Sequence, residues 1–245
     1  VRQAPADGHT LAVVTNAHMV WNPYVFPKLS YDPAADLQAV SPISIIPMAL
    51  VVNPKLPVRT LPELFALARK EPGKLNYASS GNGSPPHVLF EMLRDQAGAD
   101  IVHVPFKTGT DALTSVAAGD TQIYFAGTSL VEPMVKDGRL RVLAVSPHVD
   151  VPAFAQAPTL QSLGFAGYES AVWLGLVAKA GVPAAVVQRL NAEVDKAMSD
   201  PAMAKALLSH GALPYHASTA AFDERIARER ATWGPAIQRM GIKPN

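Results

Sequence analysis

The stretch Tyr77-Ala78-Ser79-Ser80-Gly81-Asn82-Gly83-Ser84-Pro85-Pro86-His87 decides how this chain is interpreted. Residues 75–79 form a short apolar run with strand propensity, and a loop of Gly, Asn and Ser follows it. Ser84 before Pro85 predicts a helix start, with a hydroxyl N-cap and a proline at the first helical position. A strand, a glycine-rich loop and a helix N-terminus together suit an anion, because free backbone N–H groups and the positive end of the helix dipole face the loop.

The same construction occurs twice more downstream. Residues 101–104 are followed by Lys107, Thr108, Gly109 and Thr110, and residues 122–126 are followed by Gly127, Thr128 and Ser129. Strands that alternate with helices predict a parallel sheet, whose three loops then lie at one carboxyl edge. That edge is where open α/β sheets bind ligands, so we expect capture of an anionic small molecule there. The alternative is that these small residues only make turns and helix caps.

Composition restricts the class of protein. The chain has 245 residues, of which 49% are hydrophobic and 17% charged, so one large or two smaller α/β units are expected. The net charge is +1 and no basic run occurs, so neither nucleic acid nor an anionic membrane surface is an expected partner. The chain has no cysteine, which excludes disulfides and thiol catalysis and suits an oxidising compartment. Val1 is not an initiator methionine, so we expect a processed or trimmed chain.

Elsewhere in the chain, turn and cap signals mark further elements. Residues 11–14 read as a strand, with Asn16 and His18 in a fourth candidate loop at its carboxyl end. After a strand at 49–52, Thr60 and Glu63 form a capping box, and the break at Pro72-Gly73 suggests a domain boundary. Further elements are an apolar strand at 140–145, a long apolar strand at 171–178, and helices that begin near Pro183, Pro201 and Ser218 or Thr219. The last helix carries an outward charged face, which we expect to be solvated: Asp223, Glu224, Arg225, Arg228, Glu229 and Arg230.

Catalytic and metal-binding motifs do not occur in the sequence. There is no H-E-x-x-H motif, G-x-S-x-G elbow, Walker loop or G-x-G-x-x-G fingerprint, and the seven histidines show no metal spacing. His87 would either donate to an anion or serve as a cap or solvent-facing residue, and His103 alternates within a strand as a structural residue would. We therefore expect binding without catalysis, and no cofactor or metal.

Several segments, in order along nearly the whole chain, resemble the solute receptors of tripartite tricarboxylate transporters, often called Bug receptors. They are Ala6-Asp7-Gly8-His9-Thr10-Leu11, Leu50-Val51-Val52-Asn53-Pro54, residues 72–84, Val102-His103-Val104-Pro105-Phe106-Lys107, residues 139–145, Ala157-Pro158-Thr159-Leu160, residues 189–194 and Gly241-Ile242-Lys243-Pro244.

The resemblance implies an α/β, two-domain clamshell of the type II periplasmic binding-protein fold. Domain 1 would comprise residues 1–73 and 169–245, and domain 2 residues 74–168, with the first βαβ of domain 1 missing from this chain. The implied function is an extracytoplasmic, periplasmic receptor, expected to be a monomer. It would bind a di- or tricarboxylate, an aromatic acid or an amino acid between its domains and deliver it to a membrane permease. Family members often carry an acid where this chain has Ala126, which implies a less polar half-pocket here.

On this basis we predict the ligand-binding residues. One carboxylate would lie on the loops after the first two strands of domain 2, with Asn16 and His18 approaching from domain 1. Trp173 either lines the pocket near the hinge or is a core residue. The predicted set is Asn16, His18, Ser80, Gly81, Asn82, Gly83, Ser84, Lys107, Thr108, Gly109, Thr110, Ala126, Gly127, Thr128 and Trp173.

Two other classes of protein remain open from the sequence. A ligand-sensing domain of a transcription regulator can share this fold, although no helix-turn-helix segment precedes Val1 in this chain. A hydrolase would use Ser84 or Ser80 with His87, and would require turnover of an ester that Ser84→Ala abolishes.

Overall fold

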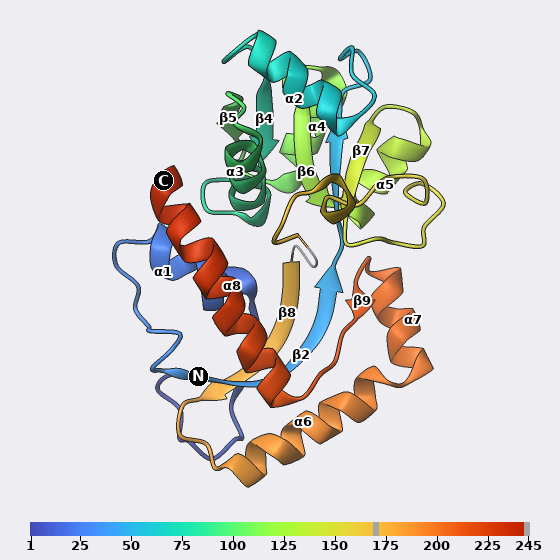
Figure 1. The fold of residues 1–245 in the computed structure, drawn as a ribbon. Helices are drawn as coiled ribbons and strands as arrows, with labels where there is room; N and C mark the ends of the chain where they lie inside the picture. The colour runs from blue at the N-terminus through green and yellow to red at the C-terminus, as the bar shows by residue number, and fades with distance from the viewer. Residues whose placement is uncertain (169–171, 243–245) are drawn as a thin grey trace. The chain divides into compact units, whose positions relative to one another are not determined.

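The computed structural model describes residues 1–168 and 172–242. The packing of Cα atoms divides the chain into two compact units, one made of Val1–Ile46 and Val172–Gly241 and the other of Pro47–Ala171 and Ile242–Asn245 (Figure 1). Residues 169–171 lie outside the described residues. The predicted domain boundary between 168 and 169 and the predicted strand residue Ala171 fall there. Lys243 and Pro244 of the closing motif lie outside them as well.

Residues 47–73 belong to the second unit, whereas the sequence analysis placed the boundary at Gly73. The reason is β3 (Met48–Val52), which hydrogen-bonds β6 (Ile123–Gly127) on one side and β7 (Arg141–Ser146) on the other. Only Pro47 separates β3 from β2 (Leu37–Ile46), which pairs in a different sheet. The chain therefore changes sheet at a proline inside an apolar stretch, and the Pro72-Gly73 break is a turn within the second unit.

The first unit contains a four-stranded sheet in the order β1-β8-β2-β9, and all its pairs are antiparallel. β1 (Leu11–Thr15) and β8 (Val172–Lys179) match predicted strands, whereas β2 and the short β9 (Leu213–Pro214) were not predicted. β2 escaped detection because Pro42 and three polar residues interrupt its pattern, and two register shifts beside β8 accommodate it. The helices of this unit are the π-helix η1 (Ala17–Trp21), α1 (Asn22–Val25), α6 (Ala184–Met198), α7 (Pro201–Ser209) and α8 (Thr219–Met240).

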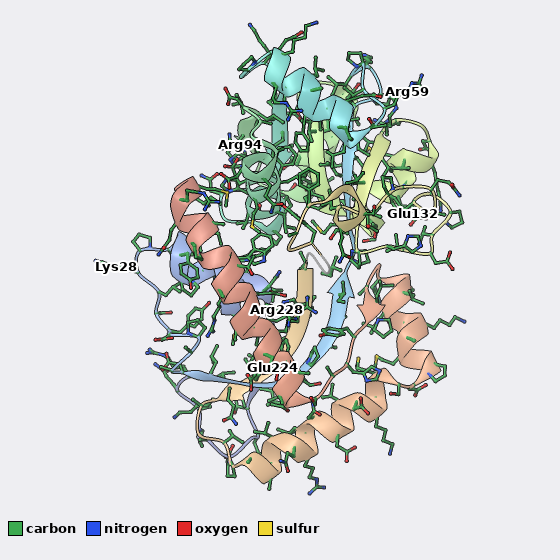
Figure 2. The ribbon with its side chains drawn as sticks, viewed as in Figure 1. Lys28, Arg59, Arg94, Glu132, Glu224 and Arg228 are labelled. Atoms are coloured by element: carbon green, nitrogen blue, oxygen red, sulfur yellow. The ribbon has the colours of Figure 1, made fainter. Side chains whose placement is uncertain are left out.

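Helix α8 packs closely on this sheet. A Cβ placed on Gly175 of β8 would lie 2.4 Å from the Phe222 ring of α8, so the absence of a side chain lets the helix approach the strand. One side of α8 is solvated as predicted, with Glu224 and Arg228 exposed (Figure 2). The prediction is wrong for Arg225, which is buried and donates from Nε to Glu229 at 2.8 Å.

The second unit contains a five-stranded mixed sheet in the order β5-β4-β6-β3-β7. Strand β4 (Asn76–Ser79) pairs in parallel with β5 (Val102–Pro105) and with β6, as the sequence predicted, whereas β3 runs antiparallel to both of its neighbours. The helices are α2 (Leu61–Lys70), α3 (Pro85–Ala97), α4 (Gly109–Ala118), α5 (Thr128–Lys136) and the 3-10 turn η2 (Gln161–Leu163).

At the start of α2 the Thr60 half of the predicted capping box forms, while the Glu63 side chain bonds one residue before the cap. Thr60 Oγ1 accepts a hydrogen bond from the Glu63 N–H at 3.3 Å. The Glu63 carboxylate accepts from the N–H of Arg59 at 2.7 Å, one residue before the cap. Figure 2 shows Arg59 at this end of α2 and Arg94 on α3, where Arg94 pairs with Glu91 at 2.7 Å.

Candidate functional site

The loops after β4, β5 and β6 are neighbours at one edge of the second unit's sheet. The Phe106 N–H donates to the Ser79 carbonyl at 2.9 Å, which joins the first two loops. A Cβ placed on Gly109 would lie 3.2 Å from the Tyr124 hydroxyl and 3.3 Å from Leu130 Cδ2, which brings the second loop beside β6 and α5. The structure therefore brings together the three segments that the sequence assigned to a common edge.

Backbone N–H groups of the loop after β4 (residues 80–84, the first loop) form hydrogen bonds within the protein. The Gly81 N–H donates to Ser79 Oγ at 3.1 Å, the Gly83 N–H to His87 Nδ1 at 3.0 Å and the Ser84 N–H to the Gly81 carbonyl at 3.2 Å. The expectation that these backbone N–H groups are free for an anion is thus wrong for three of the five loop residues. The loop is a self-bonded turn whose polar groups largely face inward.

The start of α3 also offers fewer donors than its position suggested. Ser84 occupies the N-cap position, but its hydroxyl makes no cap hydrogen bond and donates to the Gly81 carbonyl at 2.6 Å. Pro85 and Pro86 occupy the first two helical positions and have no N–H. Two of the donors that a helix N-terminus normally presents are therefore absent from this one.

The start of α4, unlike that of α3, retains its backbone N–H donors. Thr108 caps the helix, because its Oγ1 accepts from the Asp111 N–H at 3.1 Å and donates to the Asp111 carboxylate at 2.8 Å. Gly109 and Thr110 are the first two helical residues, whose amides have no acceptor within the helix. Lys107 and Thr110 are exposed. Among the predicted loops, this one presents the strongest set of donors.

The start of α5 is more enclosed than predicted. Ala126 is fully buried in β6 opposite Ala49, and Thr128 is buried with its N–H bonded to the Pro47 carbonyl at 2.9 Å. Gly127 is half-buried at the N-cap position, and Ser129 is exposed. The predicted contact of Ala126 with ligand is corrected: its methyl group belongs to the sheet interior.

A buried cluster of polar side chains, made of Ser79, His87 and His103, is hydrogen-bonded to the first loop. His87 and His103 stack, and Ser79 Oγ lies 2.7 Å from His103 Nε2. Burial, the neighbouring His103 and Arg94 lower the pKa of His87 to about 3, and burial and Arg94 lower the pKa of His103 to about 4. Both rings are therefore neutral at neutral pH, and His87 is not a cationic anion donor. This cluster depends on the register of β4 and β5, in which Tyr77 pairs in parallel with His103, and no local sequence pattern specifies that register.

The predicted residues of the first unit lie in two different places. Asn16 is buried at the start of η1, and His18 Nδ1 accepts from the Thr15 N–H at 3.2 Å. Trp173 is fully buried, donates from Nε1 to Glu229 at 2.8 Å and packs edge-on against Phe222. Trp173 is thus a core residue, which was the alternative reading of it. The predicted role of Asn16 and His18 in binding stays a prediction.

The geometry does not support a serine hydrolase, because Ser84 and His87 do not form a nucleophile–base pair. The Ser84 hydroxyl donates to the Gly81 carbonyl, and His87 Nδ1 is occupied by the Gly83 N–H. Ser79 and His103 are hydrogen-bonded, but Ser79 is fully buried and so is not an accessible nucleophile. Within residues 1–168 and 172–242, no three His, Cys, Asp or Glu side chains gather in a way that could hold a metal ion.

Comparison with known proteins gives the family. Residues 1–242 match the model of the tripartite tricarboxylate transporter family receptor. The chain belongs to this receptor family. The resemblance found in the sequence is confirmed, and the chain is a solute receptor rather than an enzyme.

Individual relatives agree with this assignment. Protein BugT of Bordetella pertussis is 27% identical over 242 residues, which are 98% of this chain and 74% of BugT. The structure of R. palustris Rpa4515 with adipate has a TM-score of 0.82 and 30% identity, and the match covers 100% of this chain and 82% of that one. MatC from Rhodopseudomonas palustris with bound malate has a TM-score of 0.77 and 25% identity, covering 97% of this chain and 82% of that one. The predicted periplasmic binding-protein fold is thereby confirmed. In the part of the chain that the structure describes, no helix combines the length and apolar character required to cross a bilayer.

Proposed function

We propose that this receptor binds a small carboxylate at the edge of the second unit where α4 and α5 begin. The observation that carries the proposal is the family match over residues 1–242. It is supported by similarity to Rpa4515, solved with adipate, and to MatC, solved with malate. Both of those ligands are small dicarboxylates, so a ligand of this class is the first to test.

The donors at this edge suit one carboxylate group. The starts of two helices contribute about 0.3–1 kcal/mol each to binding an anion, and up to ~2 kcal/mol where they are partly buried. Each hydrogen bond to a charged group adds about 1.5–3 kcal/mol. The Gly109 and Thr110 amides and the exposed hydroxyl groups of Thr110 and Ser129 are the candidate donors. After ordering costs, several such bonds reach about −8 kcal/mol, which corresponds to micromolar affinity.

The first loop has a supporting role in this proposal. Because its amides at positions 81, 83 and 84 are already bonded, the side chain of Ser80 is the group of this loop that we propose for ligand contact. The internal bonds hold the loop in one conformation, which reduces the entropy that binding must remove.

We further propose that the receptor acts in the periplasm as a monomer and delivers its ligand to a tripartite tricarboxylate permease. The family description supports the transporter partner. The description of BugD, a structural neighbour, as a periplasmic binding protein supports the compartment.

A thermal-shift screen tests the proposal. Acetate, malate, adipate and citrate are each added to the purified chain, and the melting temperature and the ligand concentration after incubation are measured. A ligand present at 100 times its dissociation constant stabilises the folded state by ~2.7 kcal/mol, which is a rise of several degrees for a chain of this size. A melting temperature that none of these carboxylates raises, or a carboxylate that is consumed, contradicts the proposal.

A further inference from the structure

A hollow of about 680 Å³ opens on the second unit. Its lining comes from four segments that are far apart in the sequence: the start of α2, the end of α5, the start of β7 and residues 152–163. Figure 1 shows where α2, α5 and β7 lie in this unit. Sites for small molecules typically have volumes of about 300–1,000 Å³. The hollow is therefore large enough to hold a ligand of its own.

The hollow lies toward the edge of the sheet opposite to the proposed carboxylate site. Met48 of β3 pairs with Gly127, at the start of α5, and so marks the edge that carries that site. Val142, which lines the hollow, pairs with Val51, three residues farther along β3. Three residues of a strand span about 10 Å. The two positions are therefore separate places on the same unit.

Hydrogen bonds to β7 fix the walls of the hollow. Arg141 Nη1 donates to the Val58 carbonyl at 2.8 Å, which ties the segment before α2 to this strand. The Val145 N–H donates to the Pro158 carbonyl at 2.9 Å, and the Leu160 N–H donates to the Val145 carbonyl at 3.0 Å. These two bonds tie the end of the proline-rich segment to the same strand. Because the walls are already formed, a ligand does not have to order them on binding.

The lining combines an apolar surface with one cation. Arg59 is the only charged residue among the described residues that line the hollow, and Figure 2 labels it. Its backbone N–H, not its guanidinium, bonds to the Glu63 carboxylate. Within residues 1–168 and 172–242, the guanidinium has no hydrogen-bond or ion-pair partner. The apolar part of the lining includes Val135, Val142, Leu143, Pro152, Pro158 and Leu163.

This combination favours a ligand with one negative group on an apolar body. The apolar body removes apolar surface from water on both sides, and the negative group complements the single cation. A second carboxylate, as in malate, would either lie against the apolar lining, where a charge is unfavourable, or stay in water and leave that lining uncovered. The hollow therefore differs in chemistry, as well as in place, from the site of the proposed function.

We propose that the hollow is a second binding site, for a small apolar monocarboxylate such as an aromatic or branched-chain acid. The body of the ligand lies against β7 and α5, and its carboxylate faces the Arg59 guanidinium. The inference does not depend on the proposed function, because none of the residues assigned to that function lines this hollow.

Two-dimensional NMR of the isotope-labelled chain locates the binding of benzoate, which serves as the apolar monocarboxylate. The amides of Leu61, Val142 and Ala153 should shift, with a dissociation constant on the order of 1 mM, as expected for so small a ligand. Malate should leave these three amides unchanged. The amides of Gly109 and Thr110 report on the proposed carboxylate site in the same spectra, so the two sites are observed separately.

Ala153→Trp tests whether the hollow itself is the binding site. Ala153 lines the hollow and is half-buried, so an indole at this position should fill part of the space and abolish the benzoate shifts at Leu61 and Val142. Ala155→Trp is the matched control. Ala155 belongs to the same segment but is exposed and is not part of the lining, so this variant should bind benzoate as the wild type does.

Arg59→Gln tests the role of the cation. It should weaken benzoate binding about 2- to 5-fold, as expected for an ion pair in contact with water. It should leave the binding of benzyl alcohol, an uncharged molecule of similar shape, unchanged. Lys70→Gln is the control for net charge, because it removes one positive charge at the last residue of α2 and should not affect benzoate.

The results support or overturn the inference as follows. Benzoate shifts at Leu61 and Val142 that Ala153→Trp abolishes and Ala155→Trp preserves, with weaker binding in Arg59→Gln but not in Lys70→Gln, support it. Absence of these shifts in the wild type, or shifts that persist in Ala153→Trp, overturns it. Equal affinity of the wild type for benzoate and benzyl alcohol also overturns it, since the hollow would then bind apolar molecules regardless of charge. Failure of malate and adipate to shift Gly109 and Thr110 would instead contradict the proposed function alone.

Discussion

The imidazole rings of His87 and His103 stack face to face, with centroids 3.9 Å apart and planes inclined by 4°. His87 comes from the first turn of α3 and His103 from β5, so the contact joins a helix to an edge strand. Each ring also holds one end of the first loop, because His87 accepts from the Gly83 N–H and His103 is bonded to Ser79 Oγ. The pair therefore determines the conformation of the segment that the sequence identified as the central one.

This pair predicts that acid destabilises the chain. The pKa of His87 is lowered to about 3 and that of His103 to about 4, mainly by burial. In the unfolded chain both rings take up a proton near pH 6.5, whereas the folded chain excludes it. The unfolded state thus binds more protons between about pH 4 and 6.5, and the free energy of unfolding falls as the pH decreases through this window. For His87 the decrease is at most about 1.4 kcal/mol per pH unit. Urea unfolding at pH 7, 6, 5 and 4 measures it.

His87→Asn separates this effect from the titration of carboxylates. Asparagine keeps a side-chain oxygen that can accept from the Gly83 N–H but does not titrate. The variant should be less stable at pH 7, since the stacking is lost, and its stability should depend less steeply on pH between 6.5 and 4. An unchanged slope would mean that His87 is not excluded from protonation in the folded state.

Gly175 carries a prediction about packing in the first unit. Gly175→Ala would place a Cβ 2.4 Å from the Phe222 ring and 3.2 Å from the Ser41 carbonyl, so α8 or β8 must move. Overpacking of this kind typically costs about 1–3 kcal/mol. Chemical unfolding should show this loss, and the double variant Gly175→Ala with Phe222→Leu should recover part of it. Additive losses in the double variant would show that the ring is not the obstacle.

The sequence determined the second unit better than the first. Its βα repeats have clear strand, glycine and cap signals, and the parallel pairing of β4 with β5 and β6 and the three loops at one edge followed from them. The antiparallel direction of β3 could not be predicted from the sequence, because an apolar strand pairs equally well in either direction when both its faces are buried. In the first unit, β2 contains a proline and polar positions that local propensity assigns to a loop, and only its pairing with β8 makes it a strand.

For the candidate site, residue type was predictable but hydrogen-bonding state was not. The glycines and hydroxyls of the first loop are where the sequence placed them, yet their groups bond to Ser79, Gly81 and His87 instead of facing outward. Those partners depend on side-chain directions across β4, β5 and α3, which no local pattern specifies. Pro85 and Pro86 were a signal that could have been used, since two prolines remove two N–H donors from the helix start.

The buried ion pair of α8 gives the last prediction. Glu229 accepts from Arg225 Nε at 2.8 Å and from Trp173 Nε1 at 2.8 Å, and Arg225 also lies over the Tyr215 ring. Glu229→Gln keeps an acceptor oxygen but leaves the Arg225 guanidinium buried without its counter-charge, which costs about 3–5 kcal/mol in comparable buried pairs. Glu132→Gln on α5 is the matched control, because Glu132 pairs with Lys136 at the surface (Figure 2) and such pairs contribute about 0–1 kcal/mol. Urea unfolding, followed by the fluorescence of the tryptophans, should therefore show a large loss of stability for the first variant and almost none for the second. Similar values for the two would show that burial gives the Arg225–Glu229 pair no special weight, and that α8 is held to β8 chiefly by the contact of Phe222 with Trp173.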